Sequence, residues 1–399
     1  MRHIYETAGL WILKEEFKMS DNFNRRNFLK AASLGAAAVA MRPFSSIGGG
    51  QKPESAAMRR FRNLGLKYEQ DNEFYTNFKH SPAIGLGYEE GIVRRDPTDI
   101  IKVGDTYHVW YTRTAKGPAH VGFDKATDTI RAYSWDLADL WCATSLDGNH
   151  WTERGIAVRR GPKSSFDHRS VFTPNVLVAN RRYYLFYQAA GSLEQGRGWG
   201  DFAGNVIAMS WADSPDGPWT KAPQPILKTG ALGAFDHRAV HDPSLIVREG
   251  KYWLYYKGHP GGPKDRDNRW GVPIAWGVAI ADKPEGPYMK SKLNPVICGG
   301  HETIVWPYRK GVCALLSQGP EKNSLQYAED GLNFVPKAHG LDTPQAAGVY
   351  RADNFIDTDK QPGPGITWGL FHERQDRWHY LLRFDCDLSL EKGTDLEKK

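Results

Sequence analysis

The sequence predicts an all-β protein made of repeated sheet units, and three repeated sequence patterns indicate this. The first pattern is an Asp-Pro pair followed by an apolar run, a polar turn and an aromatic-rich strand, and it stands at 94–113 and 240–258. A looser copy at 172–191 has Thr in place of Asp. Repetition at long intervals, in a chain rich in Gly, Pro and aromatic residues, is typical of radially repeated sheets.

Two further patterns occur in step with the first. A tight turn of Asp or Glu followed by Gly recurs in SLDGNHW, SPDGPW, KPEGPY and AEDGLNF, and an FDHR segment recurs at 165–175 and 234–244. From about Gly85 the chain divides into five sheet units, the last with a less clear outer strand. Units of about four strands around one axis form a β-propeller. We therefore expect a five-bladed β-propeller with a short N-terminal helical extension, and rank a pair of β-sandwiches below it.

The N-terminal region predicts an export signal. The paired arginines of NRRNFLK at 24–30 precede an Ala-rich apolar run at 31–40, which is too short to span a membrane. This arrangement is typical of the twin-arginine route and predicts a periplasmic or secreted protein. Because Met19 stands just before the motif, residues 1–18 are a candidate for an over-extended gene start. The expected organisation is a signal at 1–40, a linker and helical segment at 41–80, and the propeller at 81–399.

The composition narrows the function. Aromatic residues make up 12% of the chain, and such rings suit both a sheet core and the stacking of sugars. A net charge of +6 without a dense basic stripe argues against nucleic acid as a partner. Phosphate-loop, serine-hydrolase and zinc-protease motifs are absent from the sequence. The cysteines show no paired spacing and are expected to be buried thiols: Cys142, Cys298, Cys313 and Cys386.

Candidate catalytic residues stand at the first position of the repeat. Asp96 and Asp242 open the inner strands of the first and third units, and the fourth unit carries the adjacent pair His301 and Glu302 there. A single Asp-Pro is more often a turn at the start of a strand. Two matched copies are different, because the first strands of a propeller line one central channel. Both aspartates would then face that channel, which favours a catalytic site. Carboxylates with a proton donor suit glycoside hydrolysis, and thus an oligosaccharide partner.

At these residues the chain resembles glycoside hydrolase family 117 and, more distantly, family 43. The resemblance is carried by SAAMRRF, AIGLGYEEGIVRRDPT, FDHRSVFTPN, HDPSL and GGHETIVWP. It implies removal of a terminal 3,6-anhydro-L-galactose from neoagaro-oligosaccharides, by cleavage of an α-1,3 bond with inversion. It also implies that the helical segment is exchanged between subunits of a homodimer.

The resemblance implies a role for each candidate. Asp96 would be the general base, and Asp242 would adjust the pKa and orientation of the donor. The acid would be either His301 or Glu302, and we favour His301 supported by Glu302, because a histidine titrates near neutral pH. Asp99 is a competing base, but we discount it because it lies on the opposite face of the strand.

Other polar and aromatic residues are candidates for binding the sugar, although each could equally belong to the core or to a turn. They are Thr173, Asn175, Gln188, Trp135, His168 and Trp306. No motif in the sequence requires a cofactor. The sequence is compatible with a divalent cation near the central channel but does not require one. The long loops 115–141 and 257–276 would set specificity, so the substrate is less determined than the reaction. The alternatives are a family 43-like arabinosidase or xylosidase and a non-catalytic glycan-binding propeller.

Overall fold

The computed structural model describes residues 54–58, 72–193, 204–260 and 274–390, and these are almost entirely β. Their helical parts are a single turn at 56–58 and two 3₁₀ turns, η1 (Asn72–Phe74) and η2 (Phe123–Lys125). None of the helices in these ranges is long and apolar enough to cross a membrane. The expected signal at 1–40 lies outside the described residues, as does the middle of the expected helical segment, 59–71.

The first three sheets follow the predicted units in order along the chain. The first sheet contains β2 (Arg94–Arg95), β3 (Ile101–Val103), β4 (Thr106–Thr114), β5 (Ala138–Ser145) and β6 (Trp151–Val158). The second contains β7 (Ser170–Ala179), β8 (Arg182–Ala190), β9 (Val206–Ala212) and β10 (Thr220–Lys221). The third contains β11 (Ala239–Arg248), β12 (Lys251–His259), β13 (Ala275–Ala281), β14 (Met289–Lys290) and β15 (Ile297–Cys298).

The fourth sheet has eight strands and combines the last two predicted units. One meander contains β16 (Ile304–Arg309), β17 (Gly311–Leu316), β18 (Ser324–Ala328) and β19 (Val335–His339). The other contains β20 (Gly348–Val349), β21 (Gly363–Gln375), β22 (Trp378–Ser389) and β1 (Lys79–Pro82). The two are joined because the start of the long β21 pairs with the end of β16, through Tyr308–Pro364 and Arg309–Gly363.

The outer strand of the last meander comes from the start of the chain. β1 pairs with β22 in an antiparallel register that sets Lys79 opposite Asp385. This explains why no outer strand is clear at the end of the sequence. The expected helical segment reaches Lys79, and within its described residues, 54–58 and 72–78, the helical parts are the turns at 56–58 and η1.

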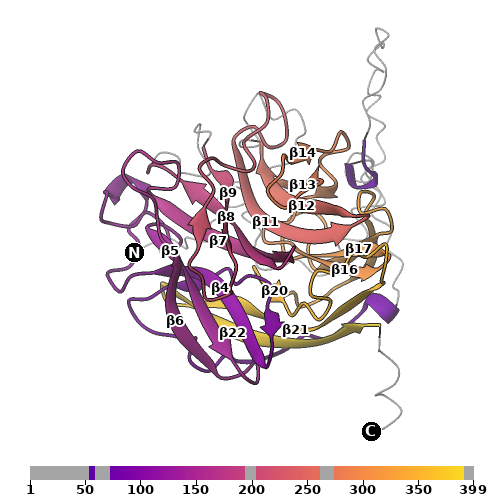
Figure 1. Cartoon of the computed structure of the whole chain (residues 1–399), viewed down its shortest axis with the longest axis horizontal. Helices are drawn as coiled ribbons and strands as arrows, with labels where there is room; N and C mark the ends of the chain where they lie inside the picture. The colour runs from indigo at the N-terminus through magenta and orange to yellow at the C-terminus, as the bar shows by residue number, and fades with distance from the viewer. Residues whose placement is uncertain (1–53, 59–71, 194–203, 261–273, 391–399) are drawn as a thin grey trace, which may run out of the picture. The chain divides into compact units, whose positions relative to one another are not determined.

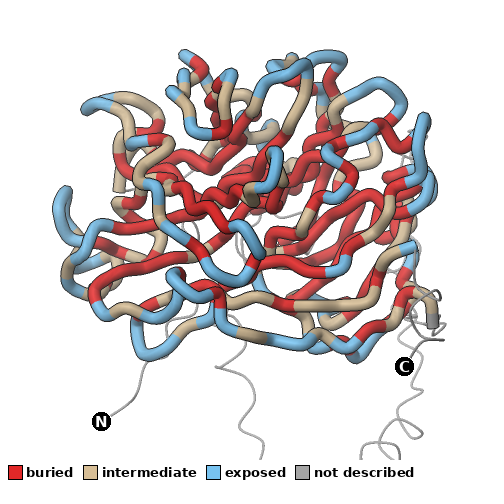
Figure 2. The backbone as a smooth tube through the Cα atoms, turned by 60° about the horizontal axis from the view of Figure 1, so that its bottom comes forward, coloured by how far each residue is buried: buried red, intermediate tan, exposed pale blue. Residues whose placement is uncertain are grey.

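The first strands of the meanders lie side by side around a common centre (Figure 1). β7 contacts β4 and β11, β11 contacts β16, and β16 contacts β20. Ile100, just before β3, forms a parallel bridge with Tyr350, just after β20. Buried residues fill these central strands, whereas the exposed residues lie mainly in the outer turns (Figure 2). Burial on both faces of the first strands explains why they read as apolar runs.

The first strands of the second and third sheets carry the same bulge. In β7 the pairs Phe172–Gln188 and Asn175–Phe186 leave two residues opposite one, and His241–Lys257 and Ser244–Tyr255 repeat this count in β11. The first of the two bulged residues has a left-handed backbone, and so has the residue at the matching position of every other meander. These residues are Asp96 (φ 50°), Thr173 (φ 45°), Asp242 (φ 46°), Glu302 (φ 64°) and Ala346 (φ 44°).

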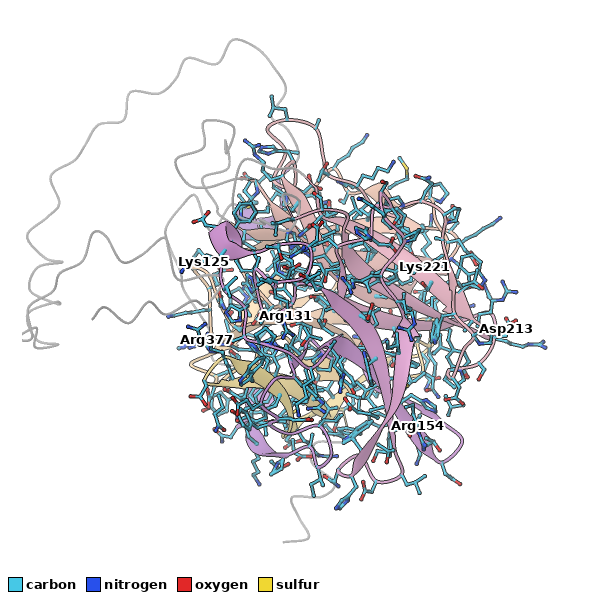
Figure 3. All side chains as sticks on the ribbon, turned by 90° about the vertical axis from the view of Figure 1, so that its left-hand side faces the viewer. Lys125, Arg131, Arg154, Asp213, Lys221 and Arg377 are labelled. Atoms are coloured by element: carbon cyan, nitrogen blue, oxygen red, sulfur yellow. The ribbon has the colours of Figure 1, made fainter. Side chains whose placement is uncertain are left out.

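The other two sequence repeats build the joints between strands. All four turn glycines of the Asp/Glu-Gly pattern have positive φ, which glycine adopts without steric cost: Gly148, Gly217, Gly286 and Gly331. The FDHR aspartates form matching ion pairs with a lysine of the outer strand of the same sheet. These pairs are Asp167–Lys221 at 2.6 Å and Asp236–Lys290 at 2.5 Å (Lys221 is labelled in Figure 3).

Candidate active site

The bulges turn polar side chains toward one central cluster. A left-handed backbone costs an L-residue other than glycine about 1–2 kcal/mol, and such strain collects at functional sites. Three of the five bulge residues are acidic: Asp96, Asp242 and Glu302. All three carboxyl side chains are at least 88% buried within the fold. Four of these five left-handed residues are the ones the sequence singled out, and Ala346 is the one it missed.

Asp96 lies in a dense set of donors. Its Oδ2 contacts Arg95 Nε at 2.8 Å and accepts hydrogen bonds from Thr173 at 3.1 Å and Thr112 at 3.4 Å. Its Oδ1 lies 3.2 Å from His372 Nδ1. Burial would raise the pKa of Asp96, but the Arg95 guanidinium and His372 outweigh it and hold the pKa below its ordinary value. Asp96 is therefore an ionised carboxylate at neutral pH.

The two arginines before Asp96 serve opposite faces of β2. Arg94 points away from the site and pairs with Glu89 at 3.0 Å and with Glu153 at 2.9 Å. Arg95 points into the site, where its Nη2 also lies 3.6 Å from Glu302 Oε1. Burial would lower the pKa of Arg95, but Asp96, Glu302 and Asp242 together raise it. The sequence reasoning missed Arg95, because strand alternation from Asp96 would place Arg94 on its face and the left-handed backbone at Asp96 breaks that alternation.

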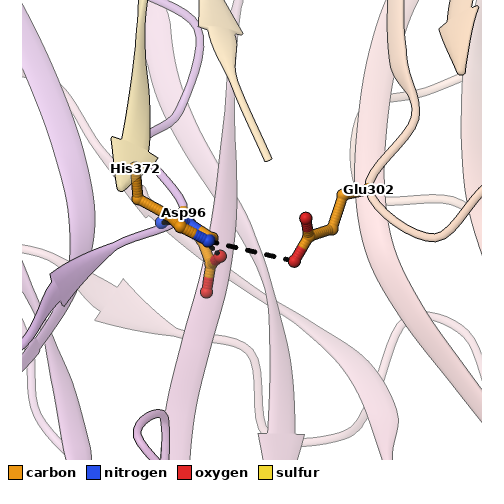
Figure 4. Close-up of side chains that lie close together, drawn as sticks. All are labelled: Asp96, Glu302 and His372. Atoms are coloured by element: carbon orange, nitrogen blue, oxygen red, sulfur yellow. Dashed lines mark hydrogen bonds and ion pairs between the residues drawn. The ribbon is translucent and has the colours of Figure 1, made fainter. Parts of the chain in front are cut away.

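Glu302 contacts two histidines. Its Oε1 lies 3.4 Å from His301 Nδ1 and 4.0 Å from His372 Nε2. Figure 4 shows His372 beside Asp96, with a dashed line across to Glu302, and the imidazole contacts both carboxylates. Burial would raise the pKa of Glu302, but His301, His372 and Arg95 lower it to about 2. Both carboxylates that flank His372 are thus ionised at neutral pH.

Asp242 is held by a lysine from the next strand. Lys257 Nζ lies 2.5 Å from Asp242 Oδ2, and both side chains are buried. Beside them, His241 Nδ1 contacts Gln188 Nε2 at 2.5 Å. Burial, with Lys257 nearby, lowers the pKa of His241 well below its ordinary value, so this ring is neutral. Asp242 thus has one charged neighbour, Lys257, whereas the adjacent polar groups of His241 and Gln188 are neutral.

A second ring of polar residues faces the bulges from the second strands. Each of its members stands opposite the residue before a bulge, and the sequence reasoning named only Gln188. The set comprises Thr112, Gln188, Lys257 and His372. In the first three sheets they follow the bulge residue by 15 or 16 residues, a spacing that could have identified Thr112 and Lys257.

Most of the predicted sugar-binding residues hydrogen-bond to protein groups. Thr173 donates to Asp96, Gln188 contacts His241, and the Asn175 side-chain oxygen accepts from the Leu245 N–H. Trp135 is half-buried and stacks on Phe172, with ring centroids 4.5 Å apart and planes 8° apart. Its loop reaches the site because the neighbouring Ser134 accepts a 2.7 Å hydrogen bond from Arg95.

Three other candidates lie elsewhere. Trp306 is 1% exposed within an apolar cluster, which corresponds to the core position that the sequence left open for it beside sugar stacking. His168 contacts the Gly161 carbonyl within its own FDHR turn. Asp99 pairs with Arg351 at 3.2 Å and accepts from the Val349 N–H, as its place on the opposite strand face predicts.

One cluster among the described residues has the composition of a metal site. Asp96, Glu302 and His372 each offer a ligand atom, and these atoms lie within 4.8 Å of one another. The Arg95 guanidinium, however, contacts both carboxylates and already supplies positive charge there. A divalent cation between them would meet like-charge repulsion from Arg95. The residues as they stand therefore do not fit a resident ion.

Comparisons with known proteins agree on the class of protein, which is a glycoside hydrolase. The model of glycosyl hydrolases family 43 matches residues 91–272. Among solved structures, Zg3597, a family 117 glycoside hydrolase produced by the marine bacterium Zobellia galactanivorans, is 38% identical and superimposes with a TM-score of 0.72. That match covers 82% of this chain and 94% of the other. No match was found among curated proteins.

More distant structures share the fold alone. One further glycoside hydrolase aligns with a TM-score of 0.53 at 11% identity, over 82% of this chain and 94% of that one. The GH43_1 enzyme from Xanthomonas citri complexed with xylose aligns with a TM-score of 0.50 at 12% identity, over 85% of this chain and 95% of that enzyme.

The propeller-type all-β fold and its cluster of buried carboxylates are those of a glycoside hydrolase. The identity with Zg3597 over most of both proteins is specific enough to give the family. The chain belongs to glycoside hydrolase family 117.

Proposed function

We propose that this hydrolase removes a terminal α-1,3-linked 3,6-anhydro-L-galactose from neoagaro-oligosaccharides or a related marine galactan fragment, with inversion. The family membership and the matching motifs around Asp96, Asp242 and Glu302 support this substrate class. We also propose that the eight-stranded sheet represents two blades, which makes five in all. A residue with a left-handed backbone at the matching position of each meander supports that reading.

The observation that carries the mechanism is that Asp96 and Glu302 are close together and both ionised. Their nearest oxygens lie within 4.8 Å, closer than the roughly 6.5–9.5 Å that separates base and acid in inverting glycosidases. A retaining pair at this distance would need one protonated carboxyl group, whereas both pKa values are lowered. The proton donor is therefore a third group, and Asp96 acts as the base that activates water.

His301 is the donor in this scheme. Its Nδ1 faces the Glu302 carboxylate at 3.4 Å, and this contact fixes the orientation of the ring. Nε2, at the far end of the ring, would deliver the proton to the glycosidic oxygen. Asp242, fixed by Lys257, would orient the sugar and the donor from the neighbouring sheet. Glu302 thus supports the acid and is not the acid itself.

The test combines one variant with a product assay. Asp96→Asn keeps the shape of the side chain but removes the base, so turnover should fall by about 10³-fold, while the melting temperature changes little. Proton NMR of the first product from wild-type enzyme should show the inverted anomer. Full activity of Asp96→Asn would remove Asp96 as the base, and a retained anomer would rule out inversion.

The substrate is tested separately by a screen of neoagaro-, carrageenan-, arabino- and xylo-oligosaccharides. Release of anhydrogalactose from the non-reducing end is the expected outcome. Release of arabinose or xylose instead would favour the family 43-like activity. Binding of these sugars without cleavage of any would favour a non-catalytic glycan-binding propeller.

A further inference from the structure

The fifth meander differs from the other four at its bulge. Its left-handed position holds Ala346, whereas the equivalent positions hold Asp96, Thr173, Asp242 and Glu302. The register makes Ala346 equivalent to Asp96, because Ile100 and Tyr350, each four residues further on, form a parallel bridge. The pairing count is also the same, since His372 N–H donates to Gln345 O while Gly348 pairs with Leu370.

In the second ring of polar residues, the members from the first and third sheets contact the bulge residue of their own sheet, whereas Gln188 of the second sheet contacts His241. Thr112 donates to Asp96, and Lys257 pairs with Asp242. His372 occupies the equivalent position in the fifth meander, where Ala346 offers no polar group. Its ring instead contacts the bulge residues of the two flanking meanders, Asp96 at 3.2 Å and Glu302 at 4.0 Å (Figure 4).

We propose that His372 is a positioning residue for the base Asp96 and for Glu302, and that Ala346 must remain small so that the His372 ring can lie between them. The proposal rests on the proposed function only in taking Asp96 as the base. His372 Nδ1 lies 3.3 Å from the Asp96 backbone nitrogen and 3.2 Å from Asp96 Oδ1, so the imidazole packs against both the backbone and the carboxylate of Asp96. With the ring displaced, Asp96 and Glu302 would lose the group between them.

A double-mutant cycle tests the contact without a substrate. Ala346→Asn adds bulk at a backbone conformation that asparagine tolerates well. In the wild-type background it should lower the melting temperature, and in a His372→Ala background, where space is free, the drop should largely disappear. Ala346→Gly is the matched control and should behave as wild type. Equal drops in both backgrounds would overturn the proposed contact.

The same cycle, read as kinetics, tests the positioning role. With any glycoside that the wild-type enzyme cleaves, Ala346→Asn and His372→Ala should each lower kcat about 100-fold and change KM less than about threefold. The double variant should be no worse than His372→Ala alone, and His372→Gln, which keeps a polar contact, should recover part of the loss. A raised KM with unchanged kcat for Ala346→Asn would show that Ala346 faces substrate and would overturn the proposal. If neoagarobiose is not cleaved but another sugar is, only the proposed substrate fails.

Discussion

Arg95 is the residue whose charge reaches every carboxylate of the site. It contacts Asp96 and Glu302 directly, and Asp242 also stabilises its charged form. A buried carboxyl group tends to become protonated, and the Arg95 charge opposes this for Asp96 and Glu302. The guanidinium therefore keeps the proposed base in its active form well into the acidic range.

This gives a prediction about pH dependence. Arg95→Gln removes the positive charge, so the pKa of Asp96 should rise and the base should become protonated at a higher pH. The acidic limb of the kcat/KM profile should therefore move to higher pH than in wild type. Arg94→Gln is the matched control, because Arg94 points to the other face of β2 and should leave this limb in place. An unchanged limb in Arg95→Gln would contradict the electrostatic role.

Single residues differ in how far the sequence reveals them. Asp96, Thr173 and Asp242 are visible because proline follows each, and Glu302 because two glycines and a histidine precede it. Ala346 has no such marker. His372 follows Ala346 by 26 residues, whereas the first three sheets use 15 or 16, because the segment between β20 and β21 is longer. The proposed role of His372 depends on contacts with residues of the two flanking meanders. The sequence near His372 contains no pattern that predicts these contacts.

At the scale of elements, the FDHR repeat acts as a clamp between the start of a sheet and its outer strand. Asp167 is almost fully buried and contacts Lys221 on β10 at 2.6 Å. Removing the lysine would leave a buried carboxylate with only Ser165 as a described side-chain partner. Lys221→Met should therefore destabilise the fold by about 2 kcal/mol, measured by chemical denaturation.

Two further variants serve as controls for this clamp. Lys290→Met removes the equivalent lysine from Asp236 and should cost a similar amount. Arg182→Ala breaks an exposed ion pair with Asp213 and should cost no more than about 0.5 kcal/mol. Equal, small effects in all three variants would mean that the clamp contributes little.

The elements themselves were largely predictable, because turn chemistry is local. The Asp/Glu-Gly turns and the alternating aromatic strands gave the order of strands in the first three sheets. The environment of Trp306 was not predictable in the same way, since an aromatic residue on an inner strand can face either the central channel or the core. The residues packed around Trp306 determine which of the two it faces, and they bury its ring.

At the scale of the molecule, β1 ties the start of the described fold to its end. A chain that begins at Ala83 would lack β1 and would expose the edge of β22. It should melt at a lower temperature than a chain beginning at Asn72 and should tend to aggregate in size-exclusion chromatography. The same melting temperature for both chains would mean that β1 does not contribute to stability.

The pairing of β1 with β22 also sets an order of events during synthesis. β1 leaves the ribosome before any other strand of the sheets, yet its partner is the last strand to be made. The other meanders can form as they emerge, whereas the last one stays open until residues near Asp385 are available. Contacts this distant in sequence form slowly. For most of its synthesis, the nascent chain therefore carries a strand without a partner, which is the stage at which such a protein is most exposed to aggregation.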